Sequence, residues 1–102
     1  MIGWYYDPKH GSCLRRIVRY GSKFKIIGVY GDDEPMTNCV WFAYIHVLDK
    51  KTDRWVLQVD FSGKPNKKNS IMQAYWYPEQ QVIKWEDGNV WRKLHVHRTQ
   101  LS

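Results

Sequence analysis

Residues 82–91 read VIKWEDGNVW, two short β-prone runs joined by a tight acidic turn. Asp-Gly and Gly-Asn both favour left-handed backbone, which tight hairpin turns require. Gly21-Ser22, between Tyr20 and Lys23, predicts a second hairpin, because glycine tolerates a positive φ at the first turn position. The sequence therefore predicts antiparallel strands joined by short turns.

The rest of the chain repeats this organisation. Runs of β-branched and aromatic residues alternate with turn residues, and only the segment Pro78 to Gln81 suits a single helical turn. The predicted strands are Gly3–Tyr6, Leu14–Tyr20, Phe24–Tyr30, Val40–Leu48, Trp55–Phe61, Ile71–Tyr77, Val82–Trp85 and Val90–His97. We expect an all-β fold: a single domain over residues 1–102, with about seven or eight antiparallel strands in a meander that forms a curled sheet or a closed barrel.

Alternation along the strands predicts which side chains face the core. Trp55–Phe61 alternates cleanly, so its odd-numbered residues form a predicted core face. Val40–Leu48 is apolar on both faces, which predicts a central strand covered on both sides. Leu14–Tyr20 mixes basic and apolar residues on both faces, with Arg15 and Arg19 opposite Arg16.

The charge is basic and unevenly placed. Sixteen Lys and Arg against ten Asp and Glu give a net charge of +6, and residues 9–25 hold six basic residues and no acid. Such a segment favours an anionic partner, either nucleic acid or an acidic protein surface, although a plain solvated face fits the same composition.

The aromatic content is high for so short a chain, with six Trp and seven Tyr among 102 residues. Consecutive aromatics on a strand point to both faces, so Tyr75 and Tyr77 face one way and Trp76 the other. Rings left on the surface could stack on bases while nearby cations contact phosphates, whereas a closed barrel could also bury them as a thick core. The predicted nucleic-acid-binding residues are Arg15, Arg16, Arg19, Lys23, Lys25, Tyr75, Trp76 and Tyr77.

Other residue combinations support no catalytic or metal site. Cys13 and Cys39 lack the spacing of a zinc or redox motif, which leaves free thiols or a bridge between them. His95 and His97 share a strand face, but two ligands do not make a metal site. His10 beside Cys13 offers a nucleophile and base only by proximity in sequence. We therefore expect no enzyme activity, no metal and no cofactor.

Two resemblances to known families concern short features. Residues 82–91 resemble the strand-turn-strand unit of Tudor-like and other SH3-like barrels, in which an aromatic precedes an acidic Gly-Asn turn. This covers about a tenth of the chain, and the strand count exceeds a lone Tudor module, so no methyl-lysine cage is carried over. Eight strands with Trp4 near the start are similar to calycin barrels, but Gly3-Trp4 lacks the intervening residue of the lipocalin Gly-x-Trp motif.

The sequence predicts a non-catalytic binding module with a basic, aromatic surface for an anionic partner, with nucleic acid as the first choice. One alternative is a calycin-like barrel that binds a small molecule or carbohydrate, and another is an accessory subunit that assembles or self-associates through an edge strand. No apolar run approaches the 18 or so residues needed to span a membrane, and no signal peptide is visible. We expect a soluble, intracellular protein without a membrane partner.

Overall fold

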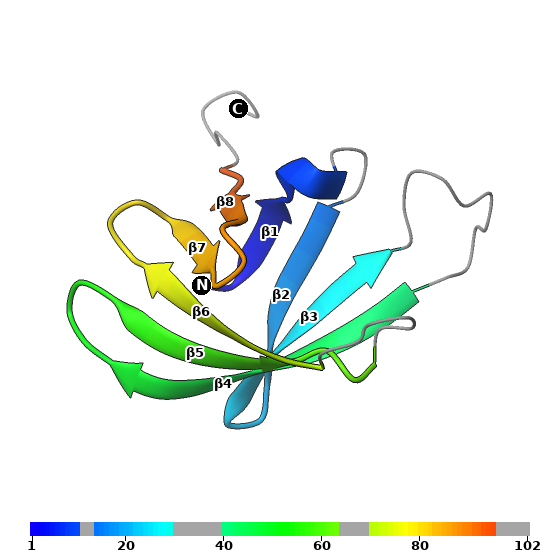
Figure 1. The fold of residues 1–102 in the computed structure, drawn as a ribbon, viewed down its shortest axis with the longest axis horizontal. Coiled ribbons are helices and arrows are strands. Elements are labelled where there is room, and N and C mark those ends of the chain that lie inside the picture. Colours follow the sequence, from blue (N-terminus) through cyan, green and yellow to red (C-terminus); the bar gives the residue numbers. More distant parts are fainter. Residues whose placement is uncertain (11–13, 30–39, 64–69, 96–102) are drawn as a thin grey trace, which may run out of the picture.

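The eight strands of this protein close into an antiparallel barrel in which each strand pairs with its sequence neighbour (Figure 1). The structure, a computed structural model, describes residues 1–10, 14–29, 40–63 and 70–95. The strands are β1 (Gly3–Tyr6), β2 (Leu14–Tyr20), β3 (Lys23–Val29), β4 (Val40–Lys50), β5 (Trp55–Asp60), β6 (Ile71–Tyr77), β7 (Val82–Trp85) and β8 (Val90–Lys93). The predicted all-β meander is confirmed, and it takes the closed form.

Both predicted hairpins are present. Gly21 has φ 61° and Gly88 has φ 90°, so each glycine adopts the left-handed conformation that its turn needs. In the second hairpin, Gly88 N donates to the Trp85 carbonyl over 3.0 Å and Trp85 N donates to the Asn89 carbonyl over 2.9 Å. These bonds set the number of residues in the turn, and the length of a turn fixes the register of its two strands.

Element boundaries differ from the predicted ones at a few places. β8 ends at Lys93, and the predicted extension to His97 falls partly outside the described residues. β4 runs on to Lys50 because a register shift between Val47 and Asp49 lets pairing with β5 continue. Between β6 and β7, Gln81 N donates to the Tyr77 carbonyl over 2.8 Å, which is the single helical turn expected there. A short 3-10 helix, η1 (Pro8–His10), was not predicted.

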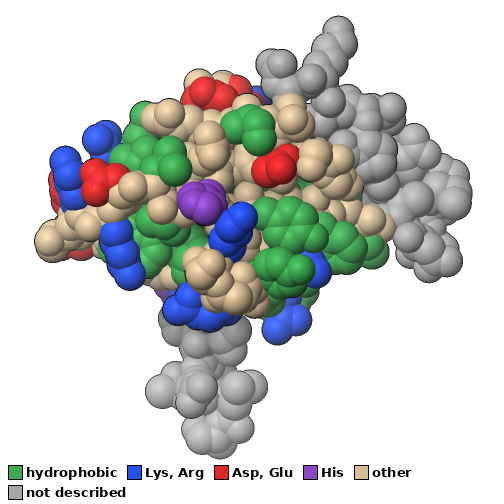
Figure 2. All heavy atoms as spheres, turned by 90° about the horizontal axis from the view of Figure 1, so that it is seen from below, with side chains coloured by type: hydrophobic (Ala, Val, Ile, Leu, Met, Phe, Trp, Pro, Cys, Tyr) green, Lys and Arg blue, Asp and Glu red, His purple; other side chains and the backbone are tan. Residues whose placement is uncertain are grey.

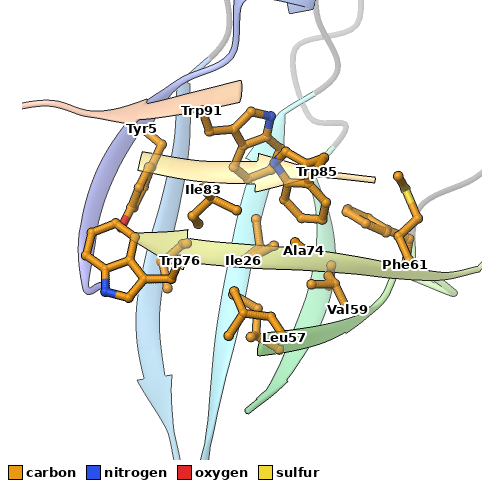
Figure 3. Packing of buried hydrophobic residues seen from close by; sticks show 14 of the residues in the cluster. Tyr5, Ile26, Leu57, Val59, Phe61, Ala74, Trp76, Ile83, Trp85 and Trp91 are labelled. Carbon is orange, nitrogen blue, oxygen red and sulfur yellow. The ribbon is translucent and has the colours of Figure 1, made fainter. Parts of the chain in front are cut away.

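The core lies inside the barrel and is rich in aromatic rings (Figure 3). Trp41, Phe61, Trp85 and Trp91 form a chain of ring contacts, with successive centroids 5.9, 5.4 and 4.7 Å apart. Leu57, Val59 and Phe61 are buried and Trp55 is half-buried, which confirms the predicted core face of this segment.

The prediction that β4 is covered on both faces is wrong. Its residues alternate between buried and exposed, and Phe42 and Val40 are 37% and 47% exposed. The reason is architectural: a closed barrel has a single interior, so apolar side chains on its outer face stay in solvent unless a partner covers them.

Closure also bears on assembly. β1 completes the barrel by pairing with β8, with Tyr5 opposite Lys93 and Tyr6 opposite Arg92. Within the described residues every strand has a hydrogen-bonded neighbour on each side. Assembly with a partner chain stays a prediction. None of the helical segments in this part of the chain is long and apolar enough to span a bilayer.

Candidate nucleic-acid interface

Outward side chains of β1 to β4 form a continuous surface that joins rings and cations. Strand register places Trp4 opposite Arg16, and Arg16 in turn opposite Ile27. In the next row across the strands, Lys25 of β3 lies opposite Tyr44 of β4. We call this surface the aromatic-basic face, and its members are Trp4, Arg16, Tyr20, Lys23, Lys25, Phe42 and Tyr44.

Within the aromatic-basic face, cations lie over rings. The Lys25 ammonium is 4.3 Å from the centroid of Phe42 and 5.2 Å from that of Tyr20. The guanidinium carbon of Arg16 is 5.4 Å from the Trp4 centroid. Trp4 and Tyr20 are 46% and 53% exposed, so these rings present much of their surface to solvent. β1, β2 and β3 contain no acidic residue, so no carboxylate of these strands offsets the cations.

A pocket adjoins this face across β3 to β6. It has a volume of about 230 Å³ and is lined by Lys23, Tyr44, His46, Gln58, Asp60 and Ile71. Tyr44 lies opposite Asp60, and His46 opposite Gln58, so two cross-strand pairs form its floor. Figure 2 views the molecule from the β4 side and shows a histidine among basic, acidic and hydrophobic side chains.

The pocket residues His46, Gln58 and Asp60 were not predicted as a site. Alternation along Trp55–Phe61 already turns Gln58 and Asp60 away from the core. What the sequence lacks is the register that sets them beside Tyr44 and His46, because pairing between β4 and β5 also depends on the shift near Val47.

Two predicted surface residues lie inside the barrel instead. Arg15 is 2% exposed and Trp76 is 2% exposed, so neither can contact a partner on the outer surface. Arg15 pairs with the inward-facing Tyr5, and this register forces its side chain inward despite its charge. Trp76 lies opposite Trp55 in the β5–β6 pair and points to the interior, while Tyr75 and Tyr77 face the other way.

The other predicted residues are distributed over different sides of the barrel. Tyr75 and Tyr77 are half-buried and lie under Arg54 and Lys84, each with a cation-to-ring distance of 4.8 Å. They belong to β6, which is separated from β2 by three strands in either direction around the eight-stranded barrel. Arg19 is exposed beside the β2–β3 hairpin, with its guanidinium carbon 5.3 Å from the Phe24 centroid. The structure therefore brings Arg16, Lys23 and Lys25 together but not with Tyr75 and Tyr77.

A buried ion pair occupies the barrel end where β2 begins. Arg15 Nη2 lies 3.5 Å from Asp7 Oδ2, and the guanidinium carbon is 5.1 Å from the Trp41 centroid and 5.9 Å from that of Trp91. Asp7 Oδ1 also accepts hydrogen bonds from Lys9 N and Asn89 Nδ2, over 3.0 and 2.9 Å. Asp7 thus ties η1 and the β7–β8 hairpin to the interior arginine.

Several buried N–H groups at this end have no acceptor among the described residues. They are Nε and Nη1 of Arg15 and Nε1 of Trp85 and Trp91. Buried donors are nearly always hydrogen-bonded in folded proteins, so a group of unpaired ones is a place where a water or a ligand oxygen would be stabilised. We call these four groups the interior donor cluster.

The opposite end of the barrel holds a half-buried amine. Burial lowers the pKa of the Met1 α-amino group to about 6, and repulsion from Lys93 and Lys50 adds to the effect. The Tyr5 hydroxyl donates to the Met1 carbonyl over 2.5 Å, and burial raises the pKa of this phenol well above its ordinary value. Met1 itself is partly buried and packs against the core.

Candidate metal and thiol residues give no site in the described residues. Within that part of the chain, no three His, Cys, Asp or Glu side chains are grouped to hold a metal. His95 is exposed, whereas His97, Cys13, Cys39 and the side chain of His10 lie outside the described residues. No protein-family model matches the chain, and no match was found among curated proteins or solved structures.

Proposed function

We propose that the chain is a non-catalytic module that binds single-stranded nucleic acid on the aromatic-basic face. The observation that carries this proposal is the surface itself, where exposed rings and cations alternate over four neighbouring strands. Each base stacked on an exposed ring contributes about 1–3 kcal/mol, and cations between the rings contact the phosphates. Rings that face solvent on a barrel have no core to join, so a stacked partner is what would bury them.

The salt dependence of binding tests the proposed contacts between cations and phosphates. If Arg16, Lys23 and Lys25 each contact one phosphate, log Kd should rise with log salt with a slope of about 2, since each contact to a single strand adds about 0.7. We would measure fluorescence anisotropy of a labelled oligothymidylate at several salt concentrations. Binding that does not change with salt, or no binding at low salt, would contradict the proposal.

Two double variants that remove the same charge test where on the barrel the nucleic acid binds. Arg16→Ser with Lys25→Ser should weaken binding at least tenfold and lower the salt slope by about 1.4, because two phosphate contacts are lost. Arg54→Ser with Lys84→Ser removes the same charge beside Tyr75 and Tyr77 and should change the affinity less than twofold. The reverse outcome would place the partner on the β6 side instead.

The interior donor cluster favours a second candidate function, the binding of a small molecule with an oxygen acceptor inside the barrel. Its buried N–H groups offer donors and no acceptors, which suits a carboxylate or carbonyl oxygen. Indole N–H signals in proton–nitrogen NMR would report it, with W85F and W91F variants assigning them. Saturable shifts of those two signals alone on adding acetate or phosphate would support this function; equal small shifts of all six indoles, or none, would contradict it.

A further inference from the structure

The pocket beside the aromatic-basic face has the size and position to hold one base of a bound strand. Lys23 and Tyr44 belong to both, so a strand that stacks on Tyr20 and Tyr44 would pass over the mouth of the pocket. A volume of about 230 Å³ falls below the roughly 300–1,000 Å³ of pockets that hold drug-sized ligands, so a single flat group suits it better.

The pocket offers a hydrogen-bond donor and a hydrogen-bond acceptor that do not pair with each other. Lys23 supplies an ammonium and Asp60 a carboxylate, yet within the described residues no ion pair joins them. Asp60 Oδ1 accepts a hydrogen bond from Ser62 N over 2.8 Å, and no described residue donates to Oδ2. The pocket therefore keeps an acceptor on one side and a donor on another, with the Gln58 amide available for either role.

This arrangement matches the edge of one base more closely than the others. Guanine carries two adjacent donors, N1–H and the 2-amino group, next to the O6 acceptor. A carboxylate can accept from both donors, while an ammonium or amide N–H can donate to O6. Thymine and uracil have one donor between two carbonyl oxygens. The Asp60 carboxylate would repel those two oxygens.

We propose that this pocket reads guanine in a single strand, with Asp60 accepting from N1–H and the 2-amino group, Lys23 or Gln58 donating to O6, and Tyr44 stacking on the ring. The inference rests on the proposed function, because the strand must first lie on the aromatic-basic face. It gives a sequence preference to a surface that would otherwise bind any single strand.

The test compares oligonucleotides that differ in one base. Labelled 11-nucleotide strands of thymidine carry a central guanine, hypoxanthine, adenine or thymine, and binding is measured by anisotropy at one low salt concentration. Hypoxanthine lacks only the 2-amino group, so the guanine strand should bind about fivefold or more tightly than the hypoxanthine and thymine strands. Equal affinity for guanine and hypoxanthine would overturn the inference.

Two isosteric variants assign the preference to the pocket. Asp60→Asn replaces an acceptor oxygen by a donor and should reduce the guanine preference to less than twofold, while binding of the all-thymidine strand is not weakened. Asp53→Asn makes the same charge change at the exposed β4–β5 connection and should keep the preference. A preference that persists in D60N would overturn the inference and leave the proposed function standing. If no strand binds in a salt-dependent manner, the proposed function fails, and the inference with it.

Discussion

Arg15 and Asp7 are the two charged residues buried in the described part of the barrel, and each depends on the other. Removing one partner of a buried pair leaves an uncompensated charge, which costs about 3–5 kcal/mol, whereas removing both often costs much less. Asp7 holds more than the ion pair, since Lys9 N and Asn89 Nδ2 also donate to it. The pair therefore joins local turn structure to the core.

We expect Asp7→Asn to lower the free energy of unfolding by about 3 kcal/mol, because Arg15 keeps its charge without a counter-ion. Arg15→Met should also destabilise the fold, and the double variant should lose less than the sum of the two single losses. Urea unfolding monitored by Trp fluorescence measures all three. Additive losses would show that the two charges do not stabilise each other.

The Met1 amine predicts a pH dependence of stability. In the unfolded chain this group has a pKa of 8.0, and in the folded chain its pKa is about 6, so the unfolded state binds more protons between these values. Stability should therefore be full above pH 8 and fall as the pH drops to 6, with urea midpoints as the measurement. Acetylation of the amine should abolish this change; the same pH profile after acetylation would assign it to another group.

At the scale of single residues, the sequence cannot decide which charge is buried. Arg15, Arg16 and Arg19 look alike in the sequence, and only the pairing of β2 with β1 turns Arg15 toward Asp7 and Trp41. Trp76 could be placed by alternation relative to Tyr75 and Tyr77, and it is buried as alternation allows. Its choice of face, however, depended on the register with β5.

At the scale of elements, the contact between β3 and β4 is unusually close at one point. A Cβ atom added at Gly28 would lie 2.2 Å from two ring carbons of Trp41, so the indole rests directly on the glycine backbone. Because Gly28 has no side chain, the large ring of its cross-strand partner Trp41 can enter the core directly over it.

Gly28→Ala should therefore destabilise the barrel by about 1–3 kcal/mol, the cost typical of overpacking a core. Gly21→Ala, which has free space around it, serves as the control for backbone effects and should cost about 1 kcal/mol through its positive φ. In the double variant with Trp41→Phe, the loss from Gly28→Ala should shrink, as thermal melts would show. An equal loss in both backgrounds would contradict the clash.

Strands and turns were the parts of this fold that the sequence predicted best. Gly21-Ser22 and Asp87-Gly88 specify their hairpins through local backbone preferences, which need no distant partner. The prediction for β4 is wrong because its outer residues, such as Phe42, are as apolar as its inner ones. The hydrophobicity of a strand residue predicts its burial only when it is known whether its face of the sheet is covered.

At the scale of the whole molecule, the barrel is closed by its shortest interface. β1 and β8 share two paired positions, Tyr5 with Lys93 and Tyr6 with Arg92, and one more hydrogen bond runs from Leu94 N to the Trp4 carbonyl. β3 and β4 pair at six positions. Cooperative opening should therefore begin where β1 meets β8.

Amide hydrogen exchange followed by NMR measures this directly. We expect the amides at the β1–β8 interface to exchange faster than those of β3 and β4, because fewer bonds must break to expose them. Leu94→Pro removes the N–H that bonds to Trp4 and should speed exchange in β1 more than in β4. Uniform protection around the barrel would show that it opens only by global unfolding.

The candidate site also belongs to this scale, and this explains how little of it could be predicted. The basic segment predicts Arg16, Lys23 and Lys25 as binding residues, and the β2–β3 hairpin gathers them on one face. The run of consecutive aromatics predicts that Tyr75 and Tyr77 share a face, but closure places that face on the other side of the barrel. Which residues of different strands share a surface depends on how the sheet curves, and this curvature cannot be predicted from a single sequence.

Trp85 and Trp91, whose ring centroids lie 4.7 Å apart at an angle of 56°, give the molecule a built-in optical signal. Two indole chromophores this close and this tilted share their excited states, so the β7–β8 hairpin should produce a paired positive and negative band in far-ultraviolet circular dichroism. That couplet would vanish when the hairpin separates. Folding of this chain can thus be followed without any dye, label or added reporter.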